Sequence, residues 1–103
     1  MSAHPYSIGS DRLTGLSKLI EECGEVLQVA GKLIATGGDS VHWDGSDLYQ
    51  RLMEELADLD AALRFVVTMN DAVDSTVVNL RSIQKYATFL GWHETEFNEE
   101  ETP

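Results

Sequence analysis

Apolar residues recur at steps of three and four along most of this chain, and that spacing is what most restricts its fold. In the first such stretch they are Leu13, Leu16, Leu19, Ile20, Cys23, Val26, Leu27, Ala30, Leu33 and Ile34. Steps of three and four place side chains on one face of an α-helix, whereas strands alternate at steps of two. The spacing therefore predicts an amphipathic helix over about residues 11–36, ended by Gly37-Gly38.

Two further stretches show the same helical spacing. The second helix is predicted to begin at a cap formed by Ser46 or Asp47 and to run to about Asn70. The third is predicted to follow a short break at residues 71–74 and to end near Gly91. Its β-branched residues would also suit a strand, but the flanking residues continue the helical period.

Three helices with connections of roughly four to ten residues predict an all-α bundle. A chain of 103 residues is a single small domain. We therefore expect three to four helices per chain, in a bundle that oligomerisation completes. The predicted boundaries are a flexible N-terminal segment at 1–10, a folded domain at 11–93 and an acidic C-terminal tail at 94–103.

The chain is strongly acidic, with seven basic against eighteen acidic residues and a formal net charge of −11. This balance argues against nucleic-acid and anionic-membrane partners, which need clustered Lys and Arg. The single cysteine, Cys23, excludes an internal disulfide and is expected to be a small core residue. No signal peptide or membrane-spanning segment is evident, which predicts a cytoplasmic protein.

Two acidic segments carry the candidate chemistry, EECGE at residues 21–25 and EELAD at residues 54–58. Residues three apart lie on one helix face, so Glu22 pairs with Glu25, and Glu55 pairs with Asp58. If the two helices pack antiparallel, these four carboxylates can converge and will need a cation among them. Such oxygen ligands favour Mg²⁺ or Mn²⁺, which can neutralise a polyphosphate and activate a water molecule.

A solvated surface is the alternative interpretation of the first segment. Glu21, Glu22 and Glu25 lie opposite the main apolar stripe of their helix, where acidic side chains are usually wet. Val29 lies on the same side, which suggests that this side is partly covered. Glu55 and Asp58 flank the apolar stripe of the second helix and are expected at the edge of a groove.

The order and spacing of these motifs resemble a known family. LSKLIEECGEVLQVAGKL is similar to the first motif helix of MazG-like proteins, LMEELADLDAALRFV to the second, and RSIQKYATFLGWH to the closing helix. The chain from about Leu13 to Trp92 thus resembles a MazG-like member of the all-α NTP pyrophosphohydrolase superfamily. It departs from the most compact members by a longer gap between Glu25 and Glu55, filled by the loop GGDSVHWDGS.

The resemblance implies hydrolysis of a nucleoside triphosphate to the monophosphate and pyrophosphate, in nucleotide-pool house-cleaning. It implies Mg²⁺ held by Glu22, Glu25, Glu55 and Asp58, with Mn²⁺ as a substitute. Glu22 is also a catalytic residue on this reading, and Glu21 orients or deprotonates the attacking water. The family further implies a homodimer or homotetramer.

The resemblance also suggests residues for the substrate. The expected phosphate-binding side chains are Lys18, Lys32, Arg81 and Lys85, of which Lys85 matches a basic family position. The long loop could cover the base, where Trp43 or His42 would select the nucleotide.

Two other functions remain open from the sequence. One is a phosphoribosyl-ATP pyrophosphohydrolase, and the other is a non-catalytic helical dimerisation module with an acidic surface. A P-loop is excluded, because the sequence contains no GxxxxGK[ST]. The absence of a DxDxDG-type loop and of an ExxH pair argues against an EF-hand and a ferritin-like di-iron site.

Overall fold

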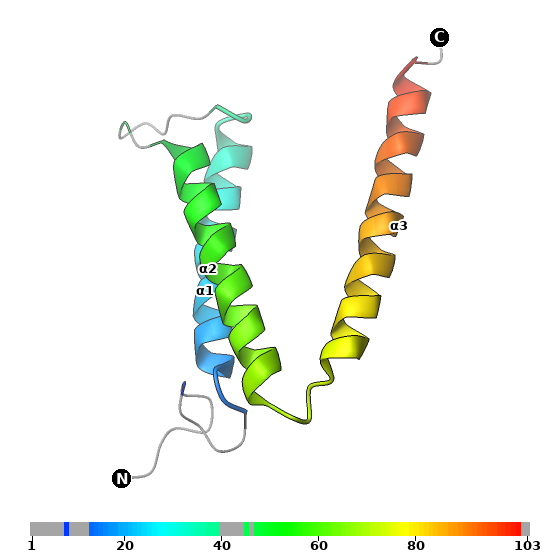
Figure 1. Cartoon of the computed structure of the whole chain (residues 1–103). Coiled ribbons are helices and arrows are strands. Elements are labelled where there is room, and N and C mark those ends of the chain that lie inside the picture. The colour runs from blue at the N-terminus through cyan, green and yellow to red at the C-terminus, as the bar shows by residue number, and fades with distance from the viewer. Residues whose placement is uncertain (1–7, 9–12, 40–44, 46, 102–103) are drawn as a thin grey trace. The chain divides into compact units, whose positions relative to one another are not determined.

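The computed structural model describes residues 8, 13–39, 45 and 47–101, with the backbone alone for 97–101. Over these residues the chain forms three α-helices and no strand, which confirms the all-α class (Figure 1). They are α1 (Leu16–Ala35), α2 (Leu48–Met69) and α3 (Ser75–Glu101). The chain divides into two units, Met1–Asp71 with α1 and α2 and Ala72–Pro103 with α3, and each is described by itself.

Helix α1 begins about one turn later than predicted and ends where predicted. Its N-cap is Gly15, whose φ of 91° lies in the left-handed region that favours glycine. At the other end, Gly37 and Gly38 have φ values of 68° and 92°. The backbone N–H of Gly38 donates to the carbonyl of Leu33 at 2.8 Å, which ends the helix in the manner expected of a C-terminal glycine pair.

Helix α2 is capped by Asp47, one of the two predicted residues. The Asp47 carboxylate accepts the backbone N–H groups of Tyr49 and Gln50 at 3.0 and 3.2 Å. These bonds satisfy two of the donors that every helix start leaves without a helical partner. The Tyr49 hydroxyl donates to the carbonyl of Gly38, which ties the start of α2 to the segment that follows α1.

The helices α1 and α2 lie side by side as an antiparallel hairpin, and Asn70 joins their ends (Figure 1). The Asn70 side chain accepts the backbone N–H of Thr14 at 3.0 Å and donates to the Thr14 carbonyl at 2.9 Å and the Val66 carbonyl at 2.7 Å. Asn70 is buried, so these bonds replace water. The start of α1 is thereby fixed against the end of α2.

A close contact at Gly15 supports the same junction. A Cβ atom at this position would lie 2.6 Å from Cδ1 of Phe65, so only glycine allows the approach without a shift of the ring. Phe65 therefore packs directly on the backbone at the start of α1.

The face that α1 turns toward α2 lies where its acidic side meets its apolar stripe. The buried residues of α1 are Glu22 and Val29, whereas Ile20, Leu27 and Ile34 are 61%, 72% and 81% exposed. The suggestion that the side of Val29 is covered is confirmed, and the solvated-face interpretation of Glu22 is wrong. The prediction that Cys23 is a core residue is also wrong, because its thiol lies on the outward side.

We call Ile20, Cys23, Leu27 and Ile34 the outer seam of α1. Their spacing of three, four and seven residues gives one continuous apolar stripe along the helix. Helix α2 also leaves Leu56 and Leu63 exposed, while Leu48, Ala62 and Val66 form its buried face. The core of this hairpin is therefore small.

Helix α3 is capped by Asp74, which accepts the backbone N–H groups of Thr76 and Val77 at 2.8 and 3.4 Å. The prediction that this helix ends near Gly91 is wrong, since α3 continues to Glu101. Gly91 does not adopt the positive φ of a helix-ending glycine, and its carbonyl accepts the hydroxyl of Thr95 at 2.9 Å. The acidic segment from residue 94 is thus helical as far as Glu101.

The described side chains of α3 are almost all exposed. Apolar side chains project around the helix rather than along one face, and they include Leu80, Ile83, Phe89 and Trp92. Phe89 and Trp92 contact each other, with ring centroids 5.5 Å apart. A helix that is apolar on several sides is normally buried. Within the described residues, no helix has the length and apolarity needed to span a membrane.

Replacing Asn70 with alanine should destabilise the hairpin. The change removes three hydrogen bonds, one to the buried Val66 carbonyl and two to the partly buried Thr14 backbone, so we expect a loss of about 2 kcal/mol in the free energy of unfolding. Urea denaturation measures it, with Asn79→Ala on the exposed surface of α3 as the matched control. Equal stability of the two variants would contradict the role given to Asn70.

Candidate metal centre

Three carboxylates meet where α1 packs against α2. Oxygen atoms of Glu22, Glu55 and Asp58 all lie within 4.8 Å of one another. Glu22 is buried, Glu55 is half-buried and Asp58 is exposed, so the group runs from the helix contact out to solvent. We call these three residues the acidic triad.

Helix geometry explains why these positions meet. Glu22 lies seven residues, or nearly two turns, before the buried Val29, so both side chains are directed to α2. On α2, Glu55 and Asp58 are seven and four residues before the buried Ala62, and all three share the side that faces α1. The antiparallel hairpin sets the two acidic segments at the same level.

The triad contains three of the four predicted metal ligands. Glu25 is not among the oxygens within 4.8 Å of one another, although its charge acts on Glu55. Glu21, the predicted water-orienting residue, has a side chain that is 58% exposed and is held by Lys18 rather than by the triad.

The environment of Glu55 disfavours its charged form. Partial burial is the largest cause that raises the pKa of its carboxyl above the usual 4.5. The negative charge of Glu25 is the next cause, followed by the charges of Asp58 and Glu22. The opposing effect of Arg51 is smaller than these. A cation at the triad would therefore relieve a repulsion that the hairpin itself creates.

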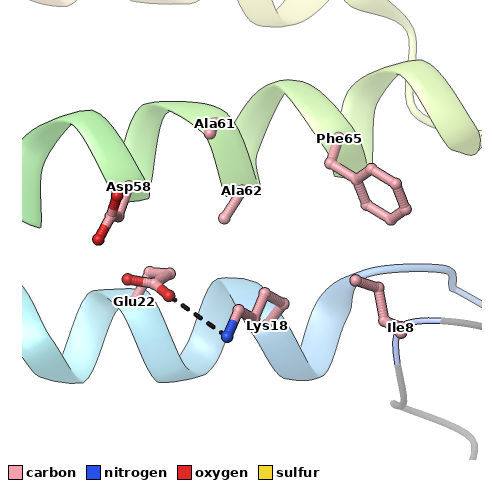
Figure 2. Close-up of a pocket in the computed structure, with 7 residues that line it drawn as sticks. All are labelled: Ile8, Lys18, Glu22, Asp58, Ala61, Ala62 and Phe65. Carbon is pink, nitrogen blue, oxygen red and sulfur yellow. Dashed lines mark ion pairs between the residues drawn. The ribbon is translucent and has the colours of Figure 1, made fainter.

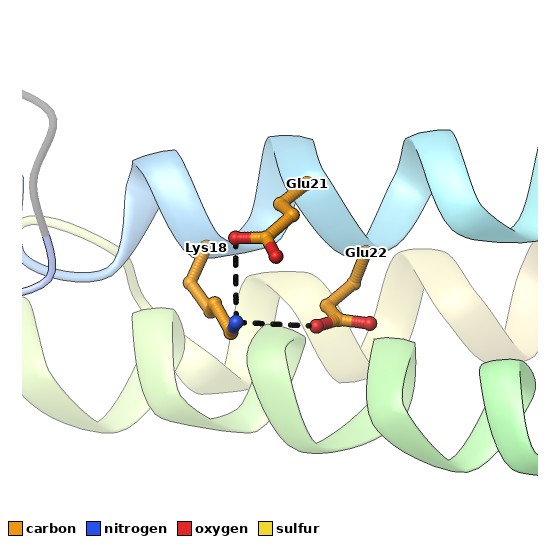
Figure 3. A network of polar contacts seen from close by, with 3 residues as sticks. All are labelled: Lys18, Glu21 and Glu22. Atoms are coloured by element: carbon orange, nitrogen blue, oxygen red, sulfur yellow. Dashed lines mark hydrogen bonds and ion pairs between the residues drawn. The ribbon is translucent and has the colours of Figure 1, made fainter.

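Lys18 supplies a positive charge at the edge of the triad (Figure 3). Its Nζ lies 3.3 Å from a carboxylate oxygen of Glu21 and 3.6 Å from one of Glu22. The hydrogen bond to Glu21 and the charge of that carboxylate are the main causes that raise the pKa of Lys18. The ammonium group thus bridges the two predicted catalytic glutamates.

Of the other predicted substrate residues, only Lys32 lies in the same unit as the triad and within the described residues. Lys32 lies ten residues beyond Glu22 on the same helix, about 15 Å along the axis, too far for direct contact. Arg81 and Lys85 lie on α3 in the second unit, and both stay predictions. His42 and Trp43 lie outside the described residues.

A cavity of about 390 Å³ opens beside the triad and shares Glu22 and Asp58 with it (Figure 2). Its further lining comes mainly from α2, where Ala61, Ala62 and Phe65 follow Asp58. No functional role was predicted for these residues. The available signal was two adjacent small residues, which begin three residues after the last acid of the second acidic motif, followed by an aromatic residue one turn later.

Comparison with known proteins adds no family assignment. No protein-family model matches the chain, and neither the curated proteins nor the solved structures give a significant match. The function must therefore be argued from the residues and from the geometry of the triad.

The raised pKa of Glu55 predicts a pH-dependent stability in EDTA. Because ionisation is harder in the folded state, it costs folding free energy above the folded pKa, and this cost disappears as the pH falls toward the unfolded value of 4.5. Glu55→Gln should therefore have a higher melting temperature than wild type at neutral pH. This difference in melting temperature should disappear on acidification. Glu54→Gln, exposed on the same helix, is the control and should show no such gap. A constant gap across the titration would contradict this account.

Proposed function

We propose that this chain is a Mg²⁺-dependent nucleoside triphosphate pyrophosphohydrolase. It would convert a (deoxy)nucleoside triphosphate to the monophosphate and pyrophosphate, in the house-cleaning of the nucleotide pool. The observation that carries the proposal is the convergence of Glu22, Glu55 and Asp58 oxygens at a helix contact. The resemblance of both acidic helices to MazG-like motifs supports the same reaction.

The donor set suits a hard divalent cation. All ligand atoms of the triad are carboxylate oxygens, with no His or Cys in the group, which favours Mg²⁺ and Mn²⁺ over Zn²⁺ or copper. Mg²⁺ in proteins typically binds one or two carboxylates, several waters and the phosphates of a substrate. The exposure of Asp58 leaves the solvent side of the triad accessible to such a substrate.

The roles of the chain's own residues follow from their positions. Glu22, Glu55 and Asp58 would hold Mg²⁺, with Glu25 as a fourth ligand near Glu55. When bound, the ion supplies positive charge for the triphosphate oxygens and lowers the pKa of a water molecule.

Lys18 and Glu21 would act on the substrate and the water. Lys18 exchanges its carboxylate partners for a phosphate oxygen, because a phosphate group carries more charge than one carboxylate. Glu21, released from Lys18, then orients the attacking water and accepts its proton. Arg81, Lys85 and Lys32 remain candidates for further phosphate oxygens, and Trp43 for the base.

We also propose that the chain forms a homodimer or a homotetramer. The outer seam of α1 and the apolar side chains of α3 support this proposal, since each is exposed on its own unit. Exposed apolar patches of this extent usually mark an interaction surface. A simple dimerisation module would need these surfaces, but it would gain nothing from burying Glu22 beside two further acids, which costs stability.

The proposed reaction is tested by pyrophosphate release with Mg²⁺ across common and modified nucleoside triphosphates and phosphoribosyl-ATP. We expect release from at least one nucleoside triphosphate, and a fall of about 100-fold or more in kcat for Glu55→Gln. Glu54→Gln, which removes the neighbouring charge outside the triad, should keep its activity.

Two outcomes would contradict the proposal. Release from phosphoribosyl-ATP alone would assign the chain to that substrate instead. No release from any compound, with a melting temperature that added Mg²⁺ leaves unchanged, would leave a non-catalytic module.

A further inference from the structure

The cavity beside the acidic triad has a charged end. Lys18, Glu22 and Asp58 line it there, and two of these three residues belong to the triad (Figure 2). A molecule that fills the whole cavity therefore reaches the proposed metal and phosphate site at one end. The volume of about 390 Å³ falls in the usual range of small-molecule sites, about 300–1,000 Å³.

The opposite end of the cavity is apolar. Figure 2 shows Phe65 and Ile8 at this end, with Ala61 and Ala62 between them and the carboxylates. Among the described lining residues, no side chain carries a hydroxyl or an amide group. An occupant is therefore held at this end by shape and apolar contact rather than by hydrogen bonds from these side chains.

The Phe65 ring is well placed to hold a flat group. One edge of the ring rests on the backbone of Gly15, at a distance that only glycine permits, and this contact limits its movement. Phe65 is nevertheless half-buried, so part of its surface remains free. A ring that is already fixed loses little side-chain entropy when a second ring stacks on it.

The spacing of the two ends matches a ligand with an anionic chain and a ring. Phe65 lies seven residues after Asp58, about 10 Å along the axis of α2. Ala61 and Ala62 have the smallest side chains that a helix can present here without glycine, and they leave the space between the ends open. A sugar can occupy this interval while the phosphates reach the triad.

We infer that the apolar end of this cavity binds the nucleobase of the substrate, with its ring against Phe65 and its edge selected by shape. The inference rests on the proposed function for the identity of the ligand, but ring binding itself needs no metal and no hydrolysis. This separation allows the two claims to be tested independently.

Ala61→Leu is the variant that tests the inference. Ala61 is exposed and lines the cavity, so a leucine there fills the space without crowding the buried core. Ala57→Leu introduces the same side chain one turn earlier on α2, at an exposed position outside the cavity lining, and is the matched control. Circular dichroism serves to check that both variants remain helical.

The readout is the NMR signal of the alanine methyl groups of the full chain in EDTA, during titration with each of the four natural deoxynucleosides. We expect ring-current shifts at the Ala61 and Ala62 methyls of the wild-type protein with at least one of them. The affinity measured at Ala62 should fall by about tenfold or more in Ala61→Leu and stay unchanged in Ala57→Leu.

The outcomes separate the two claims. Absence of shifts at both methyls in the wild-type protein, or equal affinity in Ala61→Leu, would overturn the cavity inference and leave the pyrophosphohydrolase proposal to its own assay. Shifts that Ala61→Leu abolishes, in a protein that releases no pyrophosphate, would support ring binding and reject the proposed reaction.

Discussion

The packing of α1 against α2 along the border between its acidic side and its apolar stripe is the constraint on which the site depends. It buries Glu22 and sets its carboxylate within 4.8 Å of ligand oxygens from Glu55 and Asp58. Carboxylates so close repel one another, so the contact must be held by other interactions. The Asn70 hydrogen bonds and the close approach at Gly15 supply them at one end of the hairpin. Because the fold holds these carboxylates together against their mutual repulsion, the site is suited to binding a cation.

The same orientation of α1 has a consequence on its other side. With the face around Glu22 and Val29 turned toward α2, the outer seam of Ile20, Cys23, Leu27 and Ile34 is left exposed, and α3 exposes further apolar side chains. A hairpin whose core is this small gains most by burying such surfaces against another helix. The proposed oligomer and the proposed site thus both follow from which face of α1 packs against α2.

Helical periodicity was enough to predict the three helices, the Asp47 cap and the glycine end of α1, because these depend on local sequence. The face of α1 that packs on α2 was harder to predict, because an apolar stripe indicates burial but does not identify the partner. The apolar Val29 on the acidic side correctly indicated that part of this side is covered. The end of α3 was misplaced because glycine only permits a helix to end, and Gly91 remains helical. The roles of Asn70, Gly15 and Phe65 arise from contacts between distant residues that no local pattern encodes.

The central claim is that this hairpin forms a divalent-cation site at the acidic triad. The most direct test is a crystal structure of the full chain grown with Mn²⁺, with diffraction data collected at the manganese absorption edge. The account predicts a strong anomalous peak in contact with at least two of Glu22, Glu55 and Asp58. Well-ordered triad carboxylates that point apart into solvent, with no peak beside them, would contradict it.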